Sequence, residues 1–120
     1  MGKNILFYLS TCDTCKRIMN EWSLPPDVIQ QDIKSNNISE LQLEHAKKLA
    51  GSYEALFSKL ARKFRADGHH LKTLNEEDYK RLILEEYTFL KRPVLIFKEQ
   101  IFIGNAAKVV MAAKTAIHGK

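Results

Sequence analysis

The amino-acid sequence predicts an α/β fold built on one four-stranded mixed sheet. Three observations lead to this prediction: an apolar run of strand length near the N-terminus, a change to helical periodicity directly after it, and two β-rich runs near the C-terminus. The expected order is β-α-β, a helical insertion, then β-β-α. Because 120 residues suit one domain, we expect a single domain over residues 1–120, with the insertion at about 38–87.

The first third of the chain has the pattern of a strand-helix-strand unit. Residues 4–9, NILFYL, form the strand-like run, and four residues then share one helical face: Cys15, Ile18, Met19 and Trp22. Pro25 and Pro26 stop that helix, and residues 27–33, DVIQQDI, predict a second strand. A right-handed crossover through the helix would make the two strands parallel.

The middle of the chain predicts helices. Ser39 and Gln42 have the spacing of a capping box, and Gly51 supplies a stop. Asn75 precedes three acidic residues, as an N-cap does, and would begin a further helix. The expected inward residues are Ile38, Leu41 and Leu49 in the first helix, Tyr53, Leu56, Phe57, Leu60 and Phe64 in a continuing helical stretch, and Tyr79, Leu82 and Ile83 in the last.

The C-terminal part predicts a hairpin and a final helix. Residues 93–97 and 101–104 are β-rich and flank a short polar loop at 98–100. Asn105 is the expected cap of the final helix, with inward residues Val109, Ala113, Ala116 and Ile117. A parallel strand pair and an antiparallel hairpin, covered by helices, make the thioredoxin-like arrangement.

Composition and charge favour a cytoplasmic globular protein. The chain has no apolar run of about 20 residues, and its N-terminus lacks the pattern of a secretion signal. A lasting structural disulfide is therefore not expected. The net charge is +5, but only residues 61–65 are densely basic and no nucleic-acid-binding signature accompanies them. We expect neither nucleic acid nor a membrane as a partner.

The segment STCDTCKR places Cys12 where the first strand gives way to the first helix. The N–H groups of a first helical turn have no intrahelical acceptor, so they stabilise a thiolate, and the pKa of Cys12 should lie below the ~8.5 of a free cysteine. Lys16 and Arg17 add positive charge nearby. Cys15 follows one turn later, within disulfide range. We expect Cys12 to be the nucleophile and Cys15 the resolving thiol, with Thr11 shaping the cleft beside them.

Two other interpretations of the cysteines stay open. A zinc site needs about four ligands, and the four histidines form no second ligand pair: His45, His69, His70 and His118. Cys15 also belongs to the apolar helix face, so it could be a small core residue. That interpretation leaves Cys12 unexplained, because Cys12 stands outside the apolar face.

Arg92 and Pro93 stand directly before the third predicted strand. In thioredoxin-like folds a cis proline occupies this point and faces the active cysteine. Arg92 would then bring a guanidinium group toward the thiolate, suited to an oxyanion or a carboxylate. The alternatives are a surface arginine and a proline that merely starts a strand.

Three segments, STCDTCKR, LFSKLARKFR and FLKRPVLIF, resemble the ArsC/Spx family from Asn4 to about Ile117. The resemblance implies a thioredoxin-like fold with a helical insertion, Cys12 as nucleophile, Cys15 as partner cysteine and Arg92 before the cis proline. It also implies no bound cofactor, with glutathione and glutaredoxin, or thioredoxin, as external reductant. Spx members are instead regulators that bind RNA polymerase.

Arsenate reductases of this family hold their oxyanion with three arginines. Arg92 matches one of them, whereas Ser58 and Asn105 stand near the positions of the other two. Arg62 or Arg65 is a candidate substitute, and the loss of two charged contacts argues against efficient arsenate turnover. We therefore predict a thiol–disulfide oxidoreductase acting on a small-molecule thiol or oxyanion substrate, with anion-binding residues Arg92, Lys16, Arg17 and Arg65. The alternative is an Spx-like redox-sensitive regulator that binds the RNA polymerase α subunit.

Overall fold

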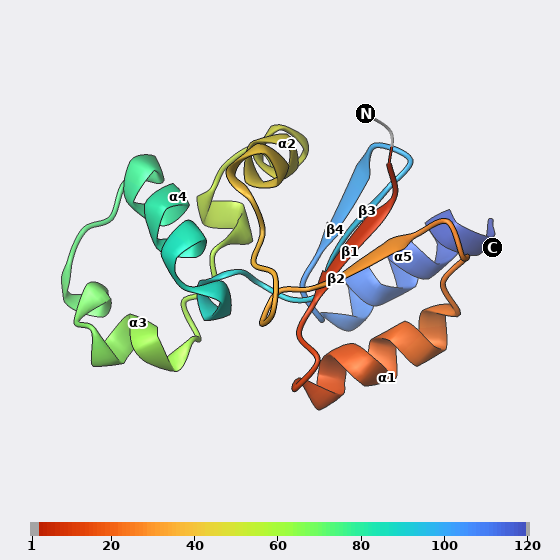
Figure 1. Cartoon of the computed structure of the whole chain (residues 1–120), viewed down its shortest axis with the longest axis horizontal. Helices are drawn as coiled ribbons and strands as arrows, with labels where there is room; N and C mark the ends of the chain where they lie inside the picture. The colour runs from red at the N-terminus through yellow and green to blue at the C-terminus, as the bar shows by residue number, and fades with distance from the viewer. Residues whose placement is uncertain (1–2, 120) are drawn as a thin grey trace. The chain divides into compact units, whose positions relative to one another are not determined.

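The computed structural model of the chain describes residues 3–119. These residues form two compact units (Figure 1). A sheet unit comprises the chain up to Asn36 and again from Arg92 onward, and a helical unit comprises Asn37–Lys91. The assignment of the whole chain to a single domain stays a prediction.

The sheet unit contains one mixed sheet and two long helices. Its elements are β1 (Ile5–Tyr8), α1 (Asp13–Trp22), β2 (Ile29–Asp32), β3 (Val94–Phe97), β4 (Gln100–Ile103) and α5 (Ala107–His118). The strands lie in the order β2-β1-β3-β4. The β1–β2 pair is parallel, and the other two pairs are antiparallel. The predicted α/β fold with a four-stranded mixed sheet is confirmed.

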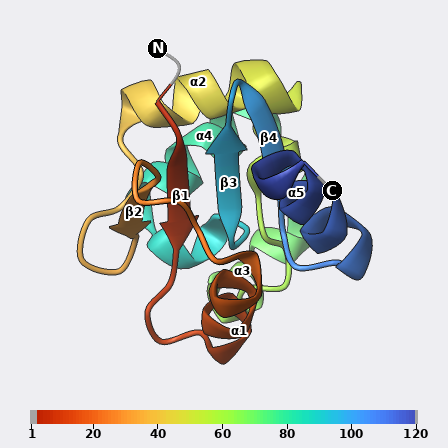
Figure 2. The same cartoon turned by 90° about the vertical axis from the view of Figure 1, so that its right-hand side faces the viewer.

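Helices α1 and α5 pack against each other and cover one face of this sheet (Figure 2). Their shared core joins α1 and α5 to strands β1 and β3 through Leu6, Ile18, Trp22, Leu95, Phe97, Val110 and Ala113. The indole Nε1–H of Trp22 donates to the carbonyl of Val110 at 3.0 Å, so this large buried ring also has its polar atom satisfied. The core therefore fixes the axis of α1, the helix that begins beside Cys12.

The start of α5 differs from its prediction. The N-cap is Ala106, which makes no side-chain capping bond, so the assignment of Asn105 as the cap is wrong. The helix begins one residue later than expected, which leaves the Asn105 side chain outside the capping position. Val110 is buried where Val109 was expected, and Ala113 is buried as predicted.

The hairpin between β3 and β4 is tighter than the sequence suggested. Lys98 and Glu99 are its two turn residues, with φ of 49° and 62°, and Gln100 already pairs with Phe97. Two consecutive residues with positive φ are typical of a two-residue hairpin turn whose twist matches that of the strands. The third residue of the expected loop is thus part of β4.

The helical unit is built from two longer helices, one short helix and several 3₁₀ turns. Its elements are α2 (Glu40–Ala50), η1 (Glu54–Leu56), α3 (Arg62–Ala66), η2 (His69–Leu71), α4 (Glu76–Glu85) and η3 (Tyr87–Phe89). As predicted, a capping box begins α2 at Ser39, Gly51 ends α2 with φ of 98°, and Asn75 is the N-cap of α4. Asn75 also forms a capping box with Asp78. The core of the unit contains Phe57, whose ring centroid lies 4.8 Å from that of Tyr79 and 5.1 Å from that of Phe89.

Two predicted inward residues of this unit are exposed. Leu41 is 80% exposed, because the buried residues of α2 are Leu43 and Ala46, and residue 41 lies on the opposite side of the helix. Leu60 is 96% exposed. The expected continuous helix is interrupted there, since Phe57 is extended and forms a bridge with Leu90. Helical spacing has no meaning across such a break.

Candidate active site

The loop between β1 and α1 places Cys12 at the start of a helix. Cys12 is the N-cap of α1, with extended backbone angles of −100° and 111°. Its N–H donates to the carbonyl of Leu9 at 3.0 Å, and its own carbonyl accepts the N–H of Lys16 at 3.2 Å, which closes the first turn. The residue is half-buried. The sulfur of Cys12 therefore lies at the positive end of the helix dipole and is still reachable by a substrate.

Several effects act on the pKa of Cys12, and their sum lowers it from the ordinary value of a cysteine. Partial burial raises the pKa, but hydrogen bonds from the backbone and thiol of Cys15, the backbone of Thr14 and the charge of Arg92 outweigh that effect. The neutral side chain makes no well-aligned capping bond to the helix. The same N–H groups nevertheless stabilise the sulfur once it is charged, because an anion accepts stronger hydrogen bonds.

Cys15 lies one turn along α1 and is fully buried. Burial, together with the neighbouring Cys12, raises the pKa of the Cys15 thiol to about 11, against the lowering effect of the Leu9 backbone and Arg92. Both cysteines are free thiols, joined by a hydrogen bond between their side chains. The pair thus consists of one accessible sulfur that ionises readily and one protected sulfur that stays protonated at neutral pH.

Arg92, which directly precedes Pro93, brings positive charge to the two cysteines. The peptide bond between them is cis, as predicted. Arg92 is half-buried, and its charge lowers the pKa values of both Cys12 and Cys15. Pro93 is buried, and its carbonyl accepts the N–H of Gly104 at 2.8 Å, which ties it to the end of the β3–β4 hairpin.

The remaining predicted site residues are less closely tied to the cysteines. Thr11, Lys16 and Arg17 are exposed in the β1–α1 loop and the first turns of α1. Arg17 also lines a hollow of about 270 Å³ between α1 and the start of α5, whose walls include Glu21 and Met111. Arg65 is exposed on α3 in the helical unit. The roles assigned to these four residues stay predictions.

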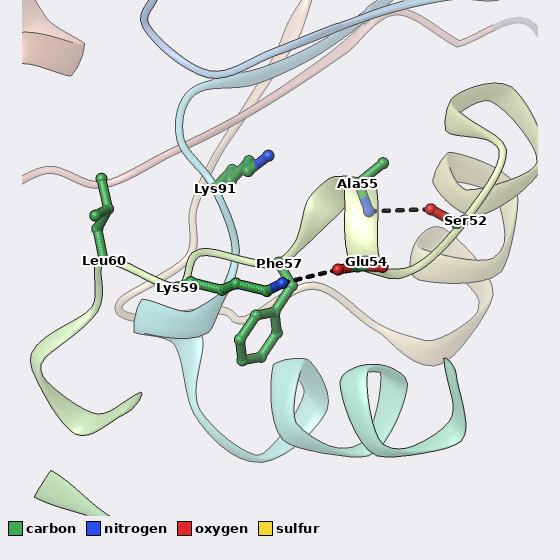
Figure 3. Close-up of a pocket in the computed structure, with 7 residues that line it drawn as sticks. All are labelled: Ser52, Glu54, Ala55, Phe57, Lys59, Leu60 and Lys91. Atoms are coloured by element: carbon green, nitrogen blue, oxygen red, sulfur yellow. Dashed lines mark hydrogen bonds and ion pairs between the residues drawn. The ribbon is translucent and has the colours of Figure 1, made fainter. Parts of the chain in front are cut away.

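The helical unit has a separate open hollow of about 470 Å³ (Figure 3). Its lining consists of Ser52, Glu54, Ala55, Phe57, Lys59, Leu60 and Lys91. The ammonium group of Lys59 is held by the carboxylate of Glu54 at 2.8 Å. Since the lining contains no thiol, and one of its two lysines is already paired, we assign no chemistry to this hollow.

Residues 3–119 contain no group of metal ligands and no helix suited to a bilayer. Within this range no three His, Cys, Asp or Glu side chains come together as a metal-binding group. No helix among the same residues has both the length and the apolar character required to cross a bilayer.

One side chain that binds the cysteine loop was not among the residues predicted for the site. Asp32, at the end of β2, accepts the backbone N–H of Ser10 at 3.2 Å. Hydrogen bonds from Ser10 lower the pKa of Asp32 most, despite some desolvation. The backbone N–H of Lys34 and the charge of its side chain lower it further. In the sequence, only its position could have indicated this contact: Asp32 stands near the end of a predicted strand that runs parallel to the strand before Cys12.

Arg92→Met is expected to raise the pKa of Cys12, because a nearby positive charge that stabilises the thiolate is lost. Alkylation at a pH below this pKa follows the thiolate fraction, so its rate should fall about threefold. The pH dependence of iodoacetamide labelling, read by mass spectrometry, measures both quantities. Lys114→Met, which removes a charge from the later part of α5, should leave the Cys12 pKa unchanged. An unchanged pKa in Arg92→Met would contradict the electrostatic role of Arg92.

A β2-β1-β3-β4 mixed sheet, a cysteine pair at the start of the first helix and a cis proline before β3 define a thioredoxin-fold thiol protein. The family is identified by sequence. A model of the ArsC family matches residues 7–113, and the chain belongs to that family, a thiol-dependent redox family. No curated protein matched the chain.

Several solved structures share the fold of this chain. A protein named YffB is 21% identical, with 95% of this chain and 98% of that chain covered and a TM-score of 0.75. An arsenate reductase from Vibrio cholerae is 13% identical, with coverages of 91% and 95% and a TM-score of 0.72. An arsenate reductase related protein from Brucella melitensis is 19% identical, with 92% of both chains covered and a TM-score of 0.66. At these identities the likeness concerns the fold.

Proposed function

We propose that this chain is a thiol–disulfide oxidoreductase in which Cys12 is the nucleophile and Cys15 the resolving thiol. The observation that carries the proposal is the contrast between the two sulfurs. Cys12 is accessible and has a lowered pKa, whereas Cys15 is buried and has a raised one. This contrast gives the two steps of a dithiol reaction a fixed order.

In the first step, the Cys12 thiolate attacks one sulfur of a substrate disulfide. The substrate S–S bond breaks, a mixed disulfide forms on Cys12, and the other half of the substrate leaves as a thiolate. The N–H groups at the start of α1 and the charge of Arg92 stabilise the attacking thiolate. The leaving thiolate takes up the proton that Cys12 had released.

In the second step, Cys15 attacks the sulfur of Cys12. Once Cys12 is bonded to substrate it no longer carries negative charge, so one of the effects that raise the pKa of Cys15 is removed. Cys15 loses its proton, the Cys12–Cys15 disulfide forms, and the second half of the substrate leaves and is protonated. Overall the substrate gains two electrons and two protons, and the protein dithiol is oxidised.

The same centre is suited to an oxyanion through the charge of Arg92, which acts on Cys12. Lys16 and Arg17, exposed in the first turns of α1, are the further cations of this proposal. Ser58 and Asn105, which stand near two arginine positions of arsenate reductases, supply no charge, so arsenate is an inefficient substrate in this proposal. A disulfide, which needs no arginine cradle, is the favoured substrate class.

An external reductant must restore the dithiol, since no bound cofactor takes part. Two glutathione molecules, acting with glutaredoxin, or the dithiol of thioredoxin, would supply the two electrons and become oxidised themselves. The cytoplasm is the compartment in which these reductants are abundant. The Spx-like alternative, in which the cysteine pair is a switch and the RNA polymerase α subunit the partner, stays a prediction.

The reduction potential of the Cys12–Cys15 pair tests the proposal. We expect the purified protein, equilibrated in glutathione redox buffers, to form one intramolecular disulfide with a potential between about −200 and −270 mV, the range of glutaredoxins and thioredoxin. The oxidised fraction is measured by mass after the remaining thiols are alkylated. Failure to form the disulfide in fully oxidised glutathione would remove the resolving role of Cys15.

A further inference from the structure

Asp32 connects the end of β2 to the loop that carries Cys12. Its carboxylate oxygen accepts the backbone N–H of Ser10 at 3.2 Å and that of Lys34 at the same distance. The two loops that follow the parallel strands β1 and β2 are therefore held by one side chain. Asp32 is the last residue of β2 and is half-buried.

The connection from Asp32 to Cys12 is short and passes through ordered backbone. Asp32 pairs with Tyr8 in the parallel register, and the next residue, Ile33, donates its N–H to the carbonyl of Tyr8 at 2.9 Å. Two residues beyond Tyr8 the Asp32 carboxylate binds Ser10, and the carbonyl of Leu9 accepts the N–H of Cys12. Every residue from the end of β1 to Cys12, except Thr11, thus takes part in one of these bonds.

We propose that Asp32 is a positioning residue for Cys12: by holding the N–H of Ser10 it keeps the Cys12 sulfur beside the first N–H groups of α1. The inference rests on the proposed function, because it assigns a support to the same nucleophile. Asp32 acts through the loop and makes no contact with the substrate.

A carboxylate suits this task because it accepts stronger hydrogen bonds than a neutral side chain. Hydrogen bonds from Ser10 and Lys34 lower the pKa of Asp32, so the group is charged throughout the range in which Cys12 titrates. Removal of Asp32 would therefore have two opposing effects on the stability of the Cys12 thiolate. Loss of a negative charge stabilises a nearby thiolate, whereas loss of the loop anchor takes the sulfur away from its N–H donors.

The two effects are separated by comparing Asp32→Ala with Asp32→Asn. Alanine removes the acceptor and the charge, and asparagine keeps an acceptor oxygen but loses the charge. We expect Asp32→Ala to slow iodoacetamide labelling of Cys12 at least ~3-fold at a pH below the Cys12 pKa of the unaltered protein, with a rise in that pKa. Asp32→Asn should label within about twofold of the unaltered protein. The matched control is Asp27→Ala, which removes another hydrogen-bonded aspartate before the opposite end of β2.

Thermal unfolding followed by circular dichroism shows whether each variant is folded under the labelling conditions. If Asp32→Ala does not fold, Asp32→Val takes its place, because valine is favoured in strands and equally lacks an acceptor. An unchanged labelling rate in the folded apolar variant overturns the proposal. So does faster labelling in both the apolar variant and Asp32→Asn, which would mean that Asp32 acts by charge.

The labelling experiment needs no substrate turnover and no disulfide, so it separates this inference from the proposed function. If the unaltered protein forms no Cys12–Cys15 disulfide while Asp32→Ala still raises the Cys12 pKa, the oxidoreductase proposal fails and the positioning role stands. If the disulfide forms but Asp32→Ala leaves the Cys12 pKa unchanged, the oxidoreductase proposal stands and the positioning role fails.

Discussion

Cys12→Ser is expected to lower kcat/KM for disulfide reduction at least ~1000-fold, a loss of about 4 kcal/mol in transition-state stabilisation. A serine hydroxyl at this position is not ionised near neutral pH, and the N–H groups at the start of α1 cannot compensate for that difference. The assay is the reduction of hydroxyethyl disulfide with glutathione as electron donor. Its rate is measured as the rate at which glutathione is oxidised.

The substitution should not disturb the fold, because Cys12 is half-buried and lies outside the core shared by α1 and α5. Asn20→Ser, on the exposed side of the same helix, is the matched control and should retain full activity. Circular dichroism of both variants checks that α1 is intact. A folded Cys12→Ser protein that reduced the disulfide as fast as the Asn20→Ser control would rule out Cys12 as the nucleophile.

The parts of the fold that the sequence predicted correctly depend on short spacings. The capping box at Ser39 and the N-cap at Asn75 need a side chain and a backbone N–H only three residues apart, and both form as expected. The position of Cys12 at the start of α1 follows from one change of period, from strand to helix. Local steric and hydrogen-bonding preferences decide such features, so one sequence is enough to predict them.

The errors occur where contacts between distant segments override the local pattern. Leu60 follows an extended segment that pairs with the chain before β3, through a bond from the N–H of Ser58 to the carbonyl of Phe89 at 2.7 Å. Nothing near Leu60 in sequence indicates that pairing. The contact between Asp32 and Ser10 spans 22 positions and depends on the register of β1 against β2. Patterns of apolar residues predict the presence of those strands but not their register.

Cys15→Ala is expected to stop turnover at the mixed disulfide and to leave the first chemical step intact. Without a resolving thiol, the substrate half bonded to Cys12 has no internal sulfur to displace it. Under single-turnover conditions, with hydroxyethyl disulfide and no added thiol, we expect about one substrate half bound per protein. Intact mass spectrometry measures it as one adduct, whereas the unaltered protein should give the Cys12–Cys15 disulfide and no adduct.

Alanine is the informative replacement because Cys15 is fully buried in the apolar face of α1. Removal of its sulfur leaves a small cavity, with an expected cost of about 1–2 kcal/mol in the free energy of unfolding, whereas Cys15→Ser would bury an additional hydroxyl group. Labelling of Cys12 should also slow in Cys15→Ala, since the Cys15 thiol no longer donates to the thiolate. If Cys15→Ala instead turned over at the rate of the unaltered protein with glutathione present, external thiols alone would resolve the intermediate. Cys15 would then be a core residue, and the protein a one-cysteine enzyme.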